Sequence, residues 1–366
     1  MKWSWKLGRF LGIDVFMHFT FLLLIGWVLL SHWAAGESLE AAIEGVGFIL
    51  ALFGCVVLHE YGHALTARRY GIKTRDITLL PIGGVARLER MPDKPAQELW
   101  VALAGPAVNV VIAIVLFVWL QLTSALVPLD ELEVGSGSFI ERLMVVNIVL
   151  VGFNMIPAFP MDGGRVVRAL LAMRMEYTRA TQIAASLGQF IAILFGFLGL
   201  ISNPFLLFIA FFVWIGAAQE ASMTQIKSAL AGIPVSRAML TDFQTVSQHD
   251  TLSRAVELIL AGSQQDFPVV DDGQVVGILT RGDIVAGLTQ RGPDAAIAEV
   301  MQREFEVFDS YDMLESAFAR LQACQCQTAP VTHAEKLVGV LTQDNVGEFL
   351  MIQAATRTVE PGQQLL

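Results

Sequence analysis

The sequence predicts a polytopic α-helical membrane domain followed by a soluble α/β domain built from two copies of one unit. Of the 366 residues, 54% are hydrophobic and 16% are charged, a composition too apolar for a soluble protein of this length. Residues 1–220 carry 15 Lys and Arg against 16 Asp and Glu, whereas residues 221–366 carry 9 against 18. The acidic half excludes nucleic acid as a partner, because phosphates need cationic groups.

Six apolar stretches are long enough to cross a hydrocarbon core of about 30 Å, which takes about 20 helical residues. They cover residues 15–33, 42–65, 99–127, 143–160, 183–200 and 204–220. A cleaved signal peptide is an alternative for the first stretch, because Lys and Arg precede it. The run is too long for one, so we expect an uncleaved helix.

Basic residues in short loops mark the cytoplasmic side of a membrane protein. They lie before the first stretch, after the second and after the fourth, at Lys2, Lys6, Arg9, Arg68, Arg69, Lys73, Arg75, Arg87, Arg90, Lys94, Arg165, Arg168, Arg174 and Arg179. The acidic segments 37–44 and 130–141 would lie outside. We therefore expect a multi-pass protein, in a prokaryotic plasma membrane, with its amino terminus and acidic half in the cytoplasm.

A His-Glu-Tyr-Gly-His segment at residues 59–63 lies within the second apolar stretch. On a helix, residues four apart lie about 40° apart around the axis and about 6 Å along it, so His59 and His63 can reach one metal ion while Glu60 stands to the side. Two imidazoles and a carboxylate suit zinc and leave a position for water, from which a neighbouring Glu can take a proton. Because polar residues are costly in a membrane, we expect a functional site rather than a satisfied polar cluster.

The third ligand must come from elsewhere, and Asp162 is the best candidate. It belongs to the segment Asn154-Met-Ile-Pro-Ala-Phe-Pro-Met-Asp-Gly-Gly-Arg165, whose prolines and glycines break the helix after the fourth stretch. The two segments should also lie at a comparable depth below the cytoplasmic surface. His59 precedes the basic Arg68 by about 13 Å of helix, and Asp162 lies just before the basic Arg165. Alternatively, Asp162 caps the helix that follows or pairs with Arg165.

These two segments together resemble the site-2 protease family of intramembrane metalloproteases, over residues of about 10–220. The resemblance implies one Zn²⁺ per chain, bound by His59, His63 and Asp162. It implies that Glu60 is the catalytic base and that Asn154 binds the substrate or polarises its carbonyl. It also implies a substrate that is a membrane-spanning segment of another protein, cleaved within the lipid bilayer.

Three further features of the membrane half have alternative interpretations. Gly105-Pro-Ala-Val-Asn109 is similar to an element that packs against the site in this family, or it is a bend with a satisfied Asn. His18 assists the site, or it is an interior histidine bonded to a neighbour. Residues 79–87 predict a short membrane-associated β hairpin or re-entrant loop, whose edge could receive an unwound substrate strand or be a structural turn only.

The acidic half repeats itself. Residues 268–280 align with residues 330–342, a period of about 62 residues, and each copy opens alike at 235–239 and 297–301. A unit that cannot bury its sheet alone pairs with its twin. The repeat resembles a CBS-domain pair of the Bateman type, over residues of about 233–352.

In the CBS family an adenine nucleotide often docks between the copies, held by the Thr and Asp of a Gly-x-x-Thr-x-x-Asp segment. The first copy matches this pattern with Thr280 and Asp283, whereas the second has Thr342 followed by Asn345, which lacks the charge of a carboxylate. The resemblance thus implies a nucleotide sensor, and the alternative is a homodimerisation module without ligand.

The predicted organisation is an intramembrane metalloprotease domain at 1–220, a linker at 221–232, CBS repeats at 233–290 and 291–352, and a tail at 353–366. A membrane transporter or channel with a regulatory CBS pair is the alternative function, since intramembrane acids and histidines can also line a path. An inactive zinc-binding scaffold ranks below both. The three cysteines suggest neither a disulfide framework nor a thiolate zinc site.

Overall fold

A computed structural model describes the chain except for residues 1–2, 82, 93, 124–136, 325 and 360–366. It divides into two compact units, Met1–Thr224 and Gln225–Leu366. The end of the third predicted stretch, most of the acidic segment that follows it and part of the predicted tail lie outside the described residues.

The amino-terminal unit begins with two paired strands rather than with a membrane helix. They are β1 (Ser4–Phe10) and β2 (Ile13–His18), which run antiparallel. β2 buries Ile13 and Val15, while the residue between them is only partly buried, a period of two that belongs to a strand. The prediction that a helix starts at residue 15 is therefore wrong. The helix begins later, as α1 (Thr20–Ala34). The prediction failed because apolar content alone does not distinguish a strand from a helix.

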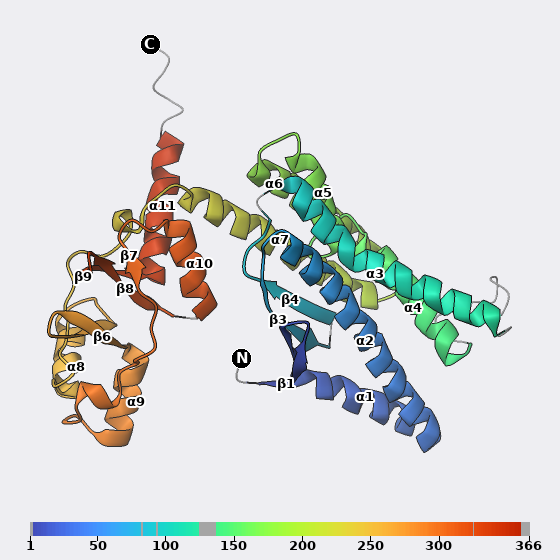
Figure 1. Cartoon of the computed structure of the whole chain (residues 1–366), viewed down its shortest axis with the longest axis horizontal. Coiled ribbons are helices and arrows are strands. Elements are labelled where there is room, and N and C mark those ends of the chain that lie inside the picture. The colour runs from blue at the N-terminus through green and yellow to red at the C-terminus, as the bar shows by residue number, and fades with distance from the viewer. Residues whose placement is uncertain (1–2, 82, 93, 124–136, 325, 360–366) are drawn as a thin grey trace, which may run out of the picture. The chain divides into compact units, whose positions relative to one another are not determined.

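These strands continue into a four-stranded sheet with the order β1-β2-β3-β4. β2 pairs parallel with β3 (Thr74–Leu80), which pairs antiparallel with β4 (Gly83–Leu88), so β4 forms one edge. The sheet packs against α2 (Leu39–Arg69), as Figure 1 shows. Ile13, Val15 and Ile77 of the sheet form a buried cluster with Tyr61 and Ala64 of α2.

The remaining helices of this unit are α3 (Pro95–Leu122), α4 (Phe139–Asn154), α5 (Asp162–Ala172), α6 (Tyr177–Ile201) and α7 (Phe205–Leu230). Within the described residues, four helices are long and apolar enough to cross a membrane, namely α2, α3, α6 and α7. α1 and α4 contain 15 and 16 residues, fewer than the approximately 20 that span a hydrocarbon core. The length and composition of these four helices are thus those of an integral membrane protein.

α5 is fixed to its neighbours by a buried ion-pair network around Arg168, whose side chain is 1% exposed. Its Nη2 lies 2.5 Å from Glu98 Oε1 of α3, and its Nη1 pairs with Glu220 of α7. Burial acts to lower the pKa of the Arg168 guanidinium, but the two carboxylates outweigh it and hold the pKa above its usual value. The sequence analysis counted Arg168 among the basic residues of short loops, whereas it lies on the helix α5 and ties three helices together.

The carboxyl-terminal unit contains two copies of a similar element order. The first copy comprises η2 (Val235–Arg237), α8 (Leu252–Ala261), β5 (Phe267–Asp271), β6 (Gln274–Leu279) and α9 (Arg281–Arg291). The second comprises η3 (Ile297–Glu299), β7 (Phe308–Asp309), α10 (Leu314–Cys324), β8 (Thr328–His333), β9 (Lys336–Thr342) and α11 (Gln343–Val359). The registers agree with the predicted repeat, since Pro268 pairs with Ile278 and Pro330 pairs with Val340, both 62 residues later.

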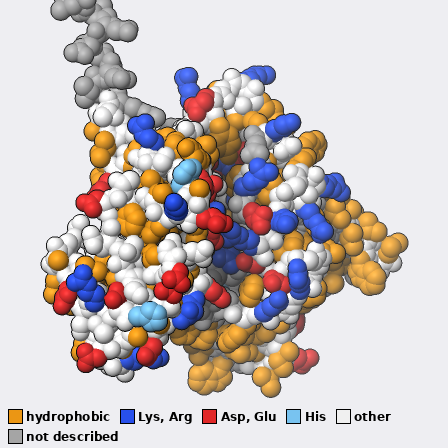
Figure 2. All heavy atoms as spheres, turned by 60° about the vertical axis from the view of Figure 1, so that its left-hand side comes forward, with side chains coloured by type: hydrophobic (Ala, Val, Ile, Leu, Met, Phe, Trp, Pro, Cys, Tyr) orange, Lys and Arg blue, Asp and Glu red, His pale blue; other side chains and the backbone are white. Residues whose placement is uncertain are grey.

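The surface of the carboxyl-terminal unit and the cysteines of the whole chain complete the description. Figure 2, which brings this unit forward, shows Asp and Glu side chains mixed with Lys and Arg over its face. Cys324 and Cys326 form a disulfide, which the sequence analysis did not expect from three cysteines, an odd count without CxxC spacing. The third cysteine, Cys55, is free and buried.

Candidate metal centre

Two histidines on α2 face one point inside the amino-terminal unit. His59 and His63 lie one helical turn apart, and both side chains are buried. Their Nε2 atoms are 3.0 Å apart. The four-residue spacing therefore places the two rings on one face of α2, as helix geometry predicts, and the rings meet edge to face.

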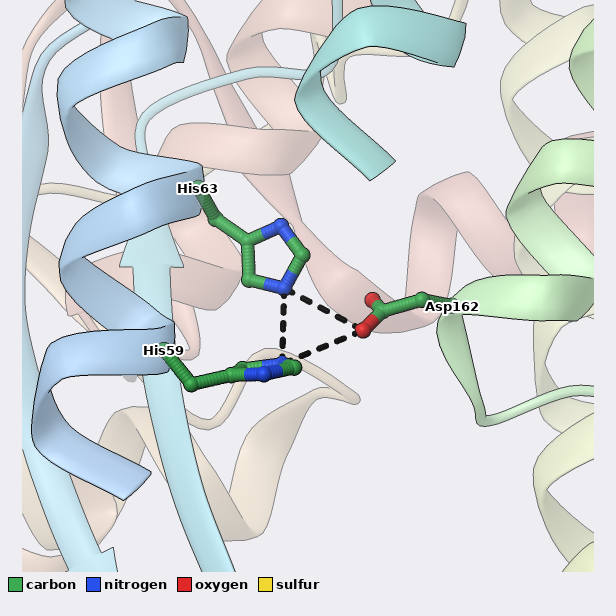
Figure 3. A group of neighbouring side chains, drawn as sticks. All are labelled: His59, His63 and Asp162. Atoms are coloured by element: carbon green, nitrogen blue, oxygen red, sulfur yellow. Dashed lines mark hydrogen bonds and ion pairs between the residues drawn. The ribbon is translucent and has the colours of Figure 1, made fainter. Parts of the chain in front are cut away.

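Asp162 completes this group from a different part of the chain. Its Oδ2 lies 3.1 Å from Nε2 of His59 and 3.2 Å from Nε2 of His63, and Figure 3 shows the carboxylate pointing at both rings. Asp162 is the first residue of α5, and its predecessor Met161 stands at the helix cap. The alternative that Asp162 caps this helix is therefore not what the structure has.

A tight turn between α4 and α5 aims the carboxylate. Gly163 and Gly164 press against the backbone of the turn: a Cβ at Gly163 would lie 2.2 Å from the Ile156 carbonyl oxygen, and one at Gly164 would lie 2.6 Å from the Phe159 nitrogen. Only residues without a side chain fit there. The two glycines after Asp162 thus let α5 start close enough to α4 to bring the carboxylate to α2.

The three donor atoms fit a zinc ion. Ligands at about 2.0–2.1 Å in a tetrahedral arrangement lie about 3.3 Å from one another, close to the separations of 3.0, 3.1 and 3.2 Å found here. His59, His63 and Asp162 form the group of possible metal ligands found among the described residues. The donor set, two imidazoles and one carboxylate, leaves a coordination position for water or substrate.

Gly105 of α3 packs directly against the two histidine rings of this centre. A Cβ at Gly105 would lie 2.1 Å from His63 Nε2 and 2.6 Å from His59 Nε2. No side chain fits beneath the two donor nitrogens. The segment 105–109, which the sequence analysis left open between a bend and a supporting element, therefore contacts both histidines.

The other ring nitrogen of each histidine is also bonded. His63 Nδ1 lies 2.7 Å from the backbone oxygen of Val101, and His59 Nδ1 bonds to Oδ1 of Asn109. Carbonyl oxygens accept hydrogen bonds, so each Nδ1 carries the proton and each Nε2 has its lone pair free. Both histidines are thus prepared as metal ligands.

Of the two other predicted site residues of the membrane unit, Glu60 follows His59 on α2 and Asn154 ends α4, before the turn that leads to Asp162. Glu60 is partly buried, and its Oε2 accepts a hydrogen bond from the Ala86 backbone nitrogen of β4 at 3.1 Å. Asn154 is the last residue of α4 and lies at the opposite end of the turn from Asp162. His18 bonds to Thr20 Oγ1 at 2.8 Å, which agrees with the alternative that it is satisfied by a neighbour.

The predicted nucleotide contacts serve as helix caps in the carboxyl-terminal unit. Asp283 accepts hydrogen bonds from the nitrogen and the hydroxyl of Thr280, at 3.1 and 2.6 Å, at the start of α9. At the start of α11, the Thr342 hydroxyl donates a hydrogen bond to Oδ1 of Asn345 at 2.5 Å. A cavity of about 830 Å³ includes Thr280 but not the other three residues. Its lining also contains Gln265, Arg281, Gly282, Val285, Ala286, Thr289, Gln290, Gln302, Cys326 and Gln327.

Known proteins resemble both units. Residues 47–195 match the model of peptidase family M50, and residues 235–289 match that of the CBS domain. The zinc metalloprotease MJ0392 of Methanocaldococcus jannaschii is 32% identical over 316 residues, 86% of this chain and 87% of that protein. The CBS domain-containing protein YhcV of Bacillus subtilis is 30% identical over 109 residues, 29% of this chain and 78% of that protein.

A solved structure of a site-2 protease from Methanocaldococcus jannaschii covers 60% of this chain and 95% of its own, with 36% identity and a TM-score of 0.46. The relatives favour a protease over the transporter or channel alternative, because MJ0392 is named a zinc metalloprotease and is similar to this chain over most of both sequences. From its similarity to MJ0392 over most of both sequences, the chain belongs to peptidase family M50, the site-2 proteases, and is a membrane zinc metalloprotease with a carboxyl-terminal CBS pair.

Proposed function

We propose that His59, His63 and Asp162 hold the zinc ion of this protease and that Glu60 is its catalytic base. The observation that carries the proposal is the convergence of three buried donor atoms, within 3.2 Å of one another, from two stretches about 100 residues apart in sequence. When bound, zinc supplies Lewis-acid activation of water and of the scissile carbonyl. The chain's own residues must supply the proton transfer and the positioning.

The proton transfer is the role that we assign to Glu60. It follows His59 directly on α2, and consecutive residues of a helix point about 100° apart around its axis, so Glu60 stands to the side of the face that carries the two histidines. In this role, a Glu60 oxygen takes a proton from the attacking water and then delivers it to the nitrogen of the leaving amine. The new C–O bond forms when the water oxygen adds to the carbonyl carbon, and the C–N bond breaks afterwards, when the amine leaves with the delivered proton.

The substrate we propose is a membrane-spanning segment of another protein, cleaved in or near the bilayer. A helix hides its carbonyl groups in internal hydrogen bonds, so the segment must be extended before attack. β4 is an edge strand beside Glu60 and could receive such an extended segment by strand addition. Asn154 then binds the segment or donates a hydrogen bond to its scissile carbonyl. Helix-breaking residues in the substrate would assist.

Metal stoichiometry tests the proposed ligands. Purified wild-type protein is expected to hold about one zinc per chain, and His59→Ala and Asp162→Ala are expected to lose it, because two ligands no longer complete the site. Atomic absorption on the three proteins, purified side by side, measures this. An Asp162→Ala protein that binds zinc as tightly as wild type would remove Asp162 from the ligand set.

We also propose that α1 and α4 cross the membrane with the four longer helices, which makes six spans. Six spans would return the chain to the side on which it starts, and the basic residues around Arg68 and Arg69 support a cytoplasmic location for that side. The amino terminus and the CBS pair would then share the cytoplasm of a prokaryotic cell, with the β3–β4 hairpin at membrane depth. One zinc ion would serve each chain.

For the CBS pair we propose regulation by an adenine nucleotide, with homodimerisation without a ligand as the competing role. The cavity that contains Thr280 is large enough for a ligand and includes one cation, Arg281, that can bind a phosphate. Asp283 is already bonded to Thr280 and Gln302, so a ribose must compete for its oxygens. A nucleotide regulates only if it binds one arrangement of the pair better than another.

Titration calorimetry with AMP on the full-length protein tests the sensor role. AMP is expected to bind wild type, and Arg281→Gln is expected to weaken binding by about 10-fold, the effect of losing a charge-assisted hydrogen bond. Arg254→Gln is the matched control, because Arg254 is an exposed arginine of the same unit that pairs with Glu257 outside the cavity. Absence of AMP binding to wild type, with a dimer in solution, would favour the dimerisation role.

A further inference from the structure

A chain of hydrogen-bonded amides runs from His59 into the interior between α3 and α4. His59 Nδ1 bonds to Oδ1 of Asn109. Asn109 Nδ2 donates to Oδ1 of Asn147 at 2.8 Å, and Asn147 Nδ2 donates to the backbone oxygen of Leu143 at 2.8 Å. The side chains of Asn109 and Asn147 are fully buried, so water cannot replace either partner. Two carboxamides in an apolar interior are costly unless each bond is made.

The Leu143 carbonyl sets the direction of every bond in this chain. A carbonyl oxygen only accepts, so Asn147 must turn its amide nitrogen toward it and its oxygen toward Asn109. Asn109 must then donate to Asn147 and present its own oxygen to His59. His59 Nδ1 must therefore carry the proton, which leaves the Nε2 lone pair free toward Asp162 and His63.

His63 reaches the same state by a shorter route. Its Nδ1 donates directly to the Val101 backbone oxygen at 2.7 Å, and a backbone oxygen cannot rotate. The Asn109 carboxamide can rotate. Turned by 180°, it would present an N–H group to His59 and favour the other tautomer, in which the proton sits on Nε2 and blocks the metal position. Among the described residues, Asn147 is the side-chain partner that opposes this rotation.

We infer that Asn147 is a positioning residue of the metal centre, which acts through Asn109 to hold His59 in its metal-binding tautomer. The inference rests on the proposed zinc ligands. Asn147 bonds to Asn109 and to the Leu143 backbone, and it is not one of the three proposed ligands. Partners bonded directly to a metal ligand, as Asn109 is to His59, commonly change metal affinity by about 10- to 100-fold, and Asn147 acts by fixing that partner.

The test is the zinc affinity of Asn147→Leu, measured by competition with a chromophoric chelator. Leu has a similar volume and removes the acceptor for Asn109, so the affinity is expected to fall about 10- to 100-fold. The visible spectrum of the Co²⁺-substituted protein should change as well, because it reports the ligand field. Asn154→Leu is the matched control on the same helix, expected to keep wild-type zinc affinity while losing cleavage.

A second substitution separates orientation from packing. Asn109→Asp, added to Asn147→Leu, places a carboxylate beside His59 that accepts in either orientation and needs no partner to fix it. The double variant is expected to recover most of the lost zinc affinity, which a packing defect at Asn147 would not allow. Wild-type affinity in Asn147→Leu, or no recovery in the double variant, overturns the inference. Wild-type protein without zinc would instead overturn the proposed ligands.

Discussion

Replacement of Glu60 by Gln is expected to lower the rate of peptide cleavage by about 10²- to 10⁴-fold while zinc stays bound. The Gln side chain has the same shape, and its oxygen can still accept the hydrogen bond from the Ala86 nitrogen, so the local structure should persist. It cannot take a proton from water. Cleavage of a reporter with a helix-breaking residue in its transmembrane segment, measured together with zinc content, checks both parts.

The two measurements distinguish three kinds of protein. Retained metal with lost cleavage fits a protease in which Glu60 is the base. Unchanged cleavage would reject Glu60 in that role, whereas loss of zinc would show that Glu60 supports the metal site. If the wild-type protein binds zinc but cleaves no membrane substrate, the chain would be an inactive zinc-binding scaffold.

Replacement of Gly105 by Ala is expected to disrupt the metal centre and lower activity by at least about 10²-fold. The added Cβ would lie 2.1 Å from His63 Nε2 and 2.6 Å from His59 Nε2, so both rings or α3 must move by about 1 Å, a misplacement that can cost this factor in rate. Zinc content and cleavage are measured on the same preparation. Both are expected to fall together.

Gly54→Ala is the control for this substitution. Gly54 lies on α2, the helix that carries both histidines, and a Cβ there would meet none of the described atoms within 4 Å. Ala favours a helix over Gly by about 1 kcal/mol, so Gly54→Ala should leave zinc and cleavage intact. If Gly105→Ala also kept wild-type zinc, the contact beneath the histidines would be irrelevant to metal binding.

The best-predicted parts of the protein are those that depend on local spacing or repetition. The four-residue spacing predicted that His59 and His63 share a helix face, and the structure brings their Nε2 atoms to 3.0 Å. The broken helix after Asn154 predicted that Asp162 turns toward them. The alignment of residues 268–280 with 330–342 predicted a pair of similar units. Zinc binding by the three residues stays a prediction.

The sequence analysis failed where contacts between distant helices decide the outcome. Arg168 appears in the sequence as one more loop cation, and only the packing of α3 and α7 shows that it is buried. Asn147 pairs with Asn109 across 38 residues, and no spacing rule links them. The strand β2 was mistaken for helix because burial on alternate residues depends on the sheet and α2, which pack against it.

The hydrogen bond between Glu60 and the Ala86 nitrogen has a consequence for the timing of the reaction. In the resting protein this carboxylate is occupied by a backbone donor of the edge strand β4. An extended segment that pairs with β4 at Ala86 must claim the same N–H group for its own carbonyl. Arrival of the polypeptide would then free the Glu60 carboxylate to take a proton, whereas without a substrate this base stays bonded to β4.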